Sequence, residues 1–128
     1  MKKTLFLLVC AGLLGAGCRS LAPVYNVQNK TVVLAANTTM QQAILQGGSA
    51  KRWTMSAVRP GLMKGVFVTR GHSVEVYIPY TQNTYSIEYA DSDNMRYNSA
   101  KKKIHPKYNQ WVRNLDLAIY RAATTTGK

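Results

Sequence analysis

The chain contains few of the residue types from which catalytic and metal-binding sites are usually built. Its 128 residues include only two cysteines, two histidines and five acidic residues. A protein zinc site needs three or four ligands, and a glycosidase needs two carboxylates. His72 and His105 are not spaced to share a metal with a carboxylate. We therefore expect no bound metal, no cofactor and no enzymatic activity.

Sequence motifs for nucleotide binding, nucleophilic catalysis and calcium binding are also missing. The chain has no Walker loop, no dinucleotide-binding fingerprint and no Gly-x-Ser-x-Gly elbow. Asp91 and Asp93 begin like a calcium loop. However, Arg96 stands where that loop needs glycine, and Lys102 where it needs a bidentate glutamate. These absences favour a binding or structural role.

The N-terminus has the pattern of an export signal. Lys2 and Lys3 precede an apolar run over residues 5–14, and small residues follow at 15–17. The apolar run is shorter than the roughly 20 residues that cross a bilayer as a helix. A cysteine directly after such a leader is typical of bacterial lipoproteins. We therefore predict cleavage before Cys18 and lipidation of Cys18; the alternative is ordinary secretion with an incidental cysteine.

A lipidated cysteine would attach the protein to a membrane of the bacterial cell envelope. In enteric bacteria, an aspartate after this cysteine tends to retain a lipoprotein in the inner membrane. Arg19 stands at that position here, which favours the periplasmic face of the outer membrane over the inner membrane. The membrane, reached through the lipid anchor on Cys18, is thus the first expected partner.

Removal of residues 1–17 leaves 111 of the 128 residues, with Cys18 as the only thiol. No internal disulfide can then form, so the fold must depend on an apolar core. A chain of this length suits one domain. We predict a signal peptide over 1–17, a lipidated cysteine and tether over 18–37, a single domain over 38–122 and a flexible tail over 123–128.

Positive charge dominates the composition, with 17 Lys and Arg against 5 Asp and Glu. Without Lys2 and Lys3 the balance is 15 against 5, a net charge of +10. Such a surface attracts polyanions, which in an envelope means anionic lipid, lipopolysaccharide or the carboxylates of peptidoglycan; an envelope protein is a further candidate partner. We expect no nucleic acid partner, because the compartment does not offer one. The candidate anion-binding residues are Arg96, Lys101, Lys102, Lys103 and Lys107, and the alternative is a solvated loop.

Hydrophobic periodicity predicts an α+β fold. A capping box at Thr38 and Gln41 begins a short helix over 38–46, which Gly47 and Gly48 would end. Four runs of alternating residues follow, at 52–59, 62–70, 72–80 and 84–90, joined by short turns. They predict a four-stranded antiparallel meander. A second amphipathic helix begins at His105 and Pro106, and we expect both helices on one face of the sheet.

The same periodicity predicts which side chains are buried. The expected core consists of Trp53, Val74, Val76, Ile78, Tyr85, Ile87, Tyr89, Trp111, Leu115 and Ile119. Met63, Phe67 and Tyr77 are expected on the opposite face of the sheet. The end of the last strand (Asp91, Ser92, Asn94) is expected to hydrogen-bond to the start of the last helix (His105, Tyr108, Asn109).

Three stretches carry a family resemblance. They are a Tyr-Ser-Ile strand at 85–87, an acidic-Ser-x-Asn turn at 91–94 and an Ile-His-x-x-Tyr-Asn-x-Trp helix start at 104–111. Over most of residues 38–119 the chain is similar to short proteobacterial lipoproteins of unassigned function. The resemblance implies a small anchored envelope domain and supplies no catalytic residues.

Two functions remain open from the sequence. The first is a lipid-anchored envelope lipoprotein with a non-catalytic binding or structural role, contacting envelope polyanions. The alternative is a periplasmic inhibitor or receptor of a glycan-processing enzyme. That alternative needs a protruding loop, which residues 93–104 could provide.

Overall fold

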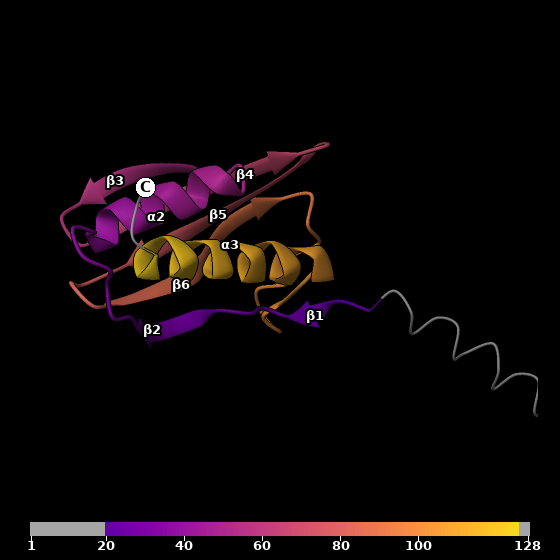
Figure 1. The fold of residues 1–128 in the computed structure, drawn as a ribbon. Coiled ribbons are helices and arrows are strands. Elements are labelled where there is room, and N and C mark those ends of the chain that lie inside the picture. Colours follow the sequence, from indigo (N-terminus) through magenta and orange to yellow (C-terminus); the bar gives the residue numbers. More distant parts are fainter. Residues whose placement is uncertain (1–19, 126–128) are drawn as a thin grey trace, which may run out of the picture.

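The computed structural model describes residues 20–125 and confirms the predicted α+β fold. Two helices lie on one face of a five-stranded antiparallel sheet, and a two-stranded sheet forms at one end of the molecule (Figure 1). Cys18, the leader and residues 126–128 lie outside the described residues. The whole hydrophobic core and all strand pairing found here lie within 20–125. A chain that begins at Arg19 therefore keeps every contact described below.

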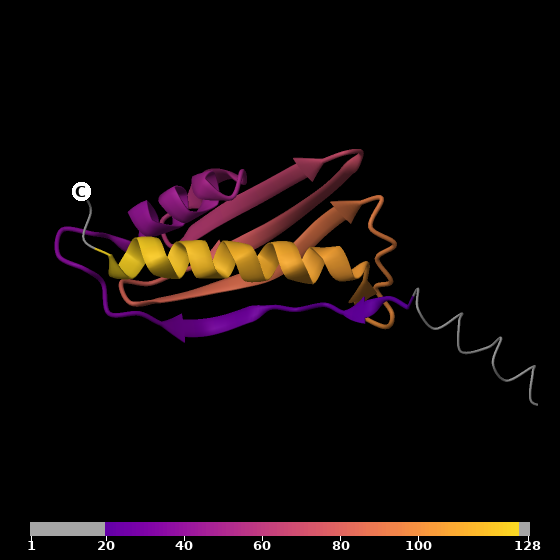
Figure 2. The same cartoon turned by 45° about the vertical axis from the view of Figure 1, so that its right-hand side comes forward.

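The elements follow the chain in the order β1 (Ala22–Pro23), β2 (Val27–Thr31), α2 (Met40–Ala50), β3 (Thr54–Arg59), β4 (Leu62–Thr69), β5 (His72–Pro79), β6 (Thr84–Asp93), β7 (Lys103–Ile104) and α3 (Pro106–Thr124). The large sheet has the strand order β2-β6-β5-β4-β3, and β1 pairs with β7. Strands β3 to β6 form the expected meander. The predicted count of four strands was wrong, because β2 adds a fifth at the far edge (Figure 2).

The segment predicted as a tether over 18–37 contains two strands instead. Within β2, Val27 lies opposite Ile87 and Lys30 opposite Tyr85, with a shift in register between them. Asn29, inside that shift, has a φ of 44°. The irregularity breaks the alternation of buried and exposed side chains. This polar stretch therefore has the sequence pattern of a loop, although it forms a strand. The domain therefore begins near Ala22 and not at residue 38.

Helix α2 begins and ends later than predicted. Its capping box consists of Thr39 and Gln42: the Gln42 amide donates to Thr39 Oγ1 at 3.2 Å, and the Thr39 amide donates to Gln42 Oε1 at 3.0 Å. Gly47 and Gly48 lie inside the helix and do not end it. A Cβ on Gly47 would lie 2.6 Å from the backbone of Ile119. The glycines thus allow α2 to pack closely on α3.

The predicted core is largely confirmed. Eight of its ten residues are buried, and Tyr89 and Trp111 are half-buried against them. The placement of Met63 and Phe67 on the opposite face was wrong, because they pair with Ile78 and Val74 and so share their face. Tyr77 alone of that group lies on the open face, where it is 40% exposed.

Helix α3 extends past the predicted end of the domain. Ala123 is fully buried, and its carbonyl oxygen accepts a hydrogen bond from the Ala35 amide at 2.9 Å. The prediction of a flexible tail over 123–128 was therefore wrong for residues 123 and 124, which belong to the helix. The last turn of α3 is part of the core.

Substitution of Gly47 by alanine tests the close helix packing. Alanine normally favours a helix over glycine by about 1 kcal/mol. At Gly47 the new Cβ would overlap the Ile119 backbone, so we expect Gly47→Ala to lower the free energy of unfolding by about 1–3 kcal/mol. Gly48→Ala is the comparison: the three atoms nearest its Cβ, from 2.6 Å, all belong to the side chain of Met55, which can change rotamer more easily than the Ile119 backbone can move. Urea denaturation should show the larger loss for Gly47→Ala; equal stability of both variants would contradict the packing argument.

Candidate functional site

The described chain begins beside the predicted basic loop. In the small sheet, Ala22 lies opposite Ile104 and Pro23 opposite Lys103. The Val24 amide also donates to the carbonyl oxygen of Lys102 at 3.0 Å. The backbone of residues 22–24 is therefore fixed next to the lysine run, although the two are about 80 residues apart in the sequence.

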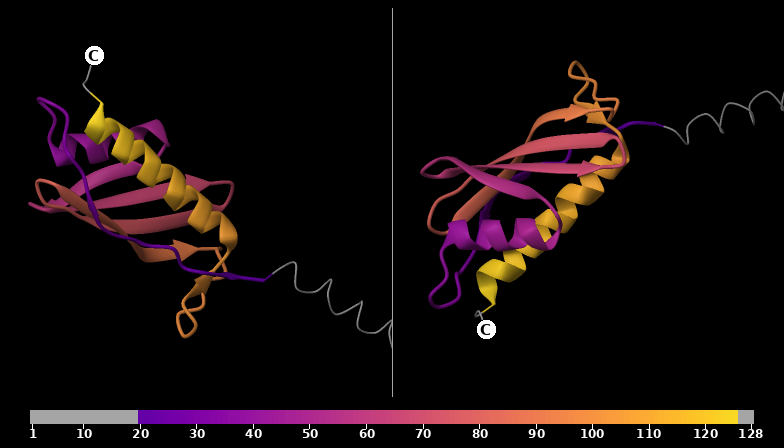
Figure 3. Two further views of the ribbon diagram at one scale, coloured as in Figure 1. Left: turned by 60° about the horizontal axis from the view of Figure 1, so that its bottom comes forward. Right: turned by 90° about the horizontal axis from the view of Figure 1, so that it is seen from above.

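The three consecutive lysines are exposed on a short turn that projects from the body of the domain (Figure 3). Asn98 and Lys103 close this turn by exchanging backbone hydrogen bonds of 2.8 and 3.2 Å. The Lys101 amide donates to Asn98 Oδ1 at 2.9 Å, and Lys102 has a left-handed φ of 54°. The turn thus has a defined backbone that presents Lys101, Lys102 and Lys103 to solvent.

A further cationic residue, Arg70, lies at the same end and was not predicted. It occupies the turn between β4 and β5, with a φ of 43°, and Gly71 follows with a φ of 82°. The Asn94 side chain donates to the Gly71 carbonyl oxygen at 3.0 Å and so joins this turn to the end of β6. The sequence held one signal, the Arg70-Gly71 pair at a tight turn between two predicted strands.

We call this part of the molecule the basic end. Its cationic residues are Arg70, Arg96, Lys101, Lys102, Lys103 and Lys107, all of which except Arg70 were predicted. Asp91 and Asp93, in the last residues of β6, are the acidic residues at the end of the strand that reaches this part of the molecule. These two aspartates extend the strand and do not form the predicted turn. Six positive charges against two negative ones leave this end strongly basic.

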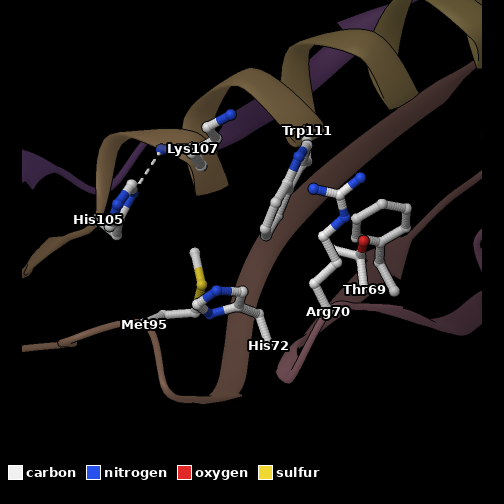
Figure 4. A pocket seen from close by; sticks show the side chains of 8 residues that line it. Thr69, Arg70, His72, Met95, His105, Lys107 and Trp111 are labelled. Atoms are coloured by element: carbon white, nitrogen blue, oxygen red, sulfur yellow. Dashed lines mark hydrogen bonds between the residues drawn. The ribbon is translucent and has the colours of Figure 1, made fainter.

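A cavity of about 390 Å³ opens at the basic end, and we call it the end pocket. It lies between the first turns of α3 and the ends of the strands (Figure 4). Its lining consists of Phe67, Thr69, Arg70, His72, Met95, His105, Lys107 and Trp111. Two of these residues are cationic, two carry imidazoles and none is acidic.

Hydrogen bonds orient both imidazoles of the end pocket. His72 Nδ1 lies 2.8 Å from the Asn94 carbonyl oxygen. A carbonyl can only accept, so Nδ1 carries the proton and Nε2 is the nitrogen left for a ligand. His105 is the N-cap of α3, and its Nδ1 accepts from the Lys107 amide at 3.1 Å. Its Nε2 therefore carries the proton and is a donor.

Asn109 holds the N-terminal segment against α3. The Tyr25 amide donates to Asn109 Oδ1 at 2.9 Å, and Asn109 Nδ2 donates to the Pro23 carbonyl oxygen at 2.9 Å. The expected side-chain bonds from Asp91, Ser92 and Asn94 to this helix start are absent among the described residues. A backbone bond joins the two regions instead, from the His105 amide to the Met95 carbonyl oxygen at 3.0 Å.

A second polar contact between the N-terminal segment and α3 involves Asp116. Lys30 Nζ lies 3.1 Å from its carboxylate, and the Tyr85 hydroxyl donates to the same carboxylate. Burial, with a further contribution from Asp116, raises the pKa of Tyr85 above its usual value. Strand β2, strand β6 and α3 thus meet at one buried carboxylate.

Two general features of the described residues 20–125 bear on function. They contain no group of three His, Cys, Asp or Glu side chains close enough to hold a metal ion. None of their helices is both long and apolar enough to cross a membrane. Comparison with protein-family models, curated proteins and solved structures finds no match to the chain.

The Asn109 contact can be tested by replacing this residue with alanine. Asn109→Ala would leave the Tyr25 amide and the Pro23 carbonyl without partners, at a cost of about 1–3 kcal/mol for each group that stays buried. We expect faster hydrogen exchange at the Tyr25 amide and a lower free energy of unfolding. Asn114→Ala, at an exposed position of the same helix, should change neither. Unchanged exchange at Tyr25 in Asn109→Ala would show that the side chain does not hold the segment.

Proposed function

We propose that this protein is a lipid-anchored bacterial envelope lipoprotein, without catalytic activity, whose basic end lies on an anionic membrane surface. The observation that supports it best is the pairing of β1 with β7, which puts the start of the described chain beside the lysine turn. Cys18 precedes Ser20 by two residues. Two residues span at most about 7 Å, so an acyl chain on Cys18 would enter a membrane close to the basic end.

The charges at this end are near enough to act on a membrane held there. Interactions between exposed charges are screened over about 8 Å at physiological ionic strength. Each lysine or arginine near an anionic surface contributes about 1 kcal/mol. The turn that carries the three lysines projects from the body of the domain (Figure 3), and the three side chains are exposed. Arg19, immediately after Cys18, adds a further charge and favours the outer membrane as the location.

The alternative is an inhibitor or receptor of a glycan-processing enzyme. The turn at 98–103 does project, as that function requires (Figure 3). However, the turn is short, and its backbone is paired with the N-terminal segment that leads to Cys18. An anchor on Cys18 would direct the turn toward the membrane and away from a periplasmic enzyme. The membrane contact is therefore the function we propose.

Metabolic labelling tests the lipid anchor. Cells that express the protein and grow with a palmitate analogue should incorporate the label into it. Cys18→Ala removes the acceptor sulfur and should abolish the label, while Cys10→Ala should keep it. A wild-type protein without label would refute the anchor.

Vesicle flotation tests the basic end separately from the anchor. The chain that begins at Arg19 lacks Cys18, so no acyl chain adds its roughly 0.8 kcal/mol per buried methylene. We expect this chain to bind vesicles with anionic lipid at low salt, to lose binding as salt rises and not to bind neutral vesicles. Replacing Lys101, Lys102 and Lys103 with glutamine should remove most of the binding.

The control for this experiment is a triple variant with the same change in charge at other places. It combines Arg59→Gln, Lys64→Gln and Arg121→Gln, and these three residues lie outside the basic end. This control should keep most of the binding, and both triple variants should unfold at the same urea concentration as the parent. Equal losses in the two variants would show that only the net charge of the protein matters.

A further inference from the structure

The end pocket offers more hydrogen-bond donors than acceptors; its acceptors are His72 Nε2 and the Thr69 hydroxyl. Arg70 and Lys107 carry only donors, and His105 presents a protonated Nε2. No carboxylate lines the pocket to accept bonds from the hydroxyl groups of a neutral sugar. A guanidinium pairs well with phosphate and carboxylate, with which it forms two parallel hydrogen bonds. The polar side of the pocket is therefore suited to an oxyanion.

Aromatic rings form the other side of the end pocket. Trp111 descends from α3 toward the strands, where its ring packs on Phe67 at 4.9 Å between centroids and a tilt of 51° (Figure 4). The indole is only half-buried, so part of it remains open to the pocket. The rings are in contact with each other, which leaves no slot for a flat aromatic ligand between them. They instead offer an apolar surface on which the C–H groups of a sugar ring can lie.

The polar side and the aromatic side of the end pocket adjoin each other at Arg70 and Trp111. In Figure 4 the guanidinium of Arg70 lies beside Trp111, while His72 and His105 lie toward the start of α3. Lys107 precedes Trp111 by one helical turn, and residues at this spacing share a face of the helix. The cavity of about 390 Å³ falls within the range of roughly 300–1,000 Å³ that is usual for small-molecule sites. A ligand that satisfies both sides needs an apolar ring face and an anionic group a few ångströms away.

We propose that the end pocket binds a sugar that carries a phosphate or carboxylate group. Arg70 holds the anion, and the sugar ring packs on the neighbouring indole of Trp111; Lys107 and His105 line the same pocket nearer the start of α3. In an envelope, two sources have this chemistry: the phosphorylated sugar of a glycolipid headgroup, and the carboxylated sugar of the cell wall. Only this choice of source rests on the proposed function; the preference for an anionic sugar does not.

Binding can be measured with soluble probes on the chain that begins at Arg19. The probes are N-acetylglucosamine 1-phosphate, N-acetylmuramic acid, neutral N-acetylglucosamine and inorganic phosphate. The indole N–H resonance of Trp111 reports occupancy by NMR, and Trp53, the other tryptophan, serves as reference. We expect at least one anionic sugar to shift the Trp111 resonance saturably and to bind about tenfold or more tighter than the neutral sugar and inorganic phosphate. The tighter of the two anionic sugars identifies the source.

Two variants with the same chemical change decide whether the pocket is responsible. Arg70→Gln should weaken binding of the preferred probe by about tenfold or more, because a charge-assisted bond is lost. Arg52→Gln is the matched control: Arg52 is also exposed, has a left-handed φ of 66° and does not line the pocket. It should leave the affinity unchanged within about twofold.

Several results would overturn the proposal. These are the absence of any saturable shift, equal affinity for the neutral sugar, equal affinity for inorganic phosphate, and equal losses in Arg70→Gln and Arg52→Gln. None of these measurements involves Cys18 or a membrane. A failure of the lipid anchor would therefore leave the result on the pocket unchanged, and a failure of the pocket would leave the anchor unchanged.

Discussion

The contact of the N-terminal segment with α3 determines where the functional features of this protein lie. Asn109 bonds to two backbone groups of that segment, and Asp116 binds Lys30 further along it. Without these bonds, partly buried polar groups would lose their partners, and the cost of about 1–3 kcal/mol applies to each group that stays out of contact with water. The segment therefore follows one path along the helix. That path places β1 beside β7, and with it the basic turn beside the chain that leads to Cys18.

The end pocket and the lysine turn share this end of the molecule for a topological reason. The turn between β4 and β5, the end of β6 and the start of α3 all lie there (Figure 2). Arg70, Arg96 and Lys107 come from these three places. Positive charge that is spread over the sequence is thus concentrated by the antiparallel order of the strands. Under the proposed function, an envelope polyanion would meet the domain at this end first.

The meander β3–β6 and helix α3 could be predicted because their hydrophobic residues recur at regular spacing. Val74, Val76 and Ile78 alternate without a break, and Tyr108, Val112 and Leu115 recur at helical spacing. Strand β2 could not be predicted, because its bulge removes the alternation that defines a strand. The glycines of α2 were misleading for a different reason. Gly47 and Gly48 often mark a helix end, and only the neighbouring Ile119 shows that close packing requires them.

The candidate site, like the fold, could be predicted from the sequence only in part. The lysine turn could be predicted because its charges are adjacent in the sequence, and the structure confirms that they are exposed. Their proximity to the N-terminal segment depends on pairing between distant residues, which local patterns do not contain. Of the residues that line the end pocket, only Lys107 was predicted as a binding residue, since Arg70, His72 and Trp111 come from three separate elements. Each of them is unremarkable within its own strand, turn or helix.

The position of β2 also has a mechanical consequence. If Cys18 is acylated, any force between the membrane and the rest of the protein enters the domain through β1 and then β2. The hydrogen bonds between β2 and β6 lie perpendicular to the strands, so a pull along β2 loads them together and not one after another. The Lys30–Asp116 contact resists the same displacement from the side of the helix. An anchor on Cys18 would thus be connected to the core through the edge strand β2, whose hydrogen bonds share the force.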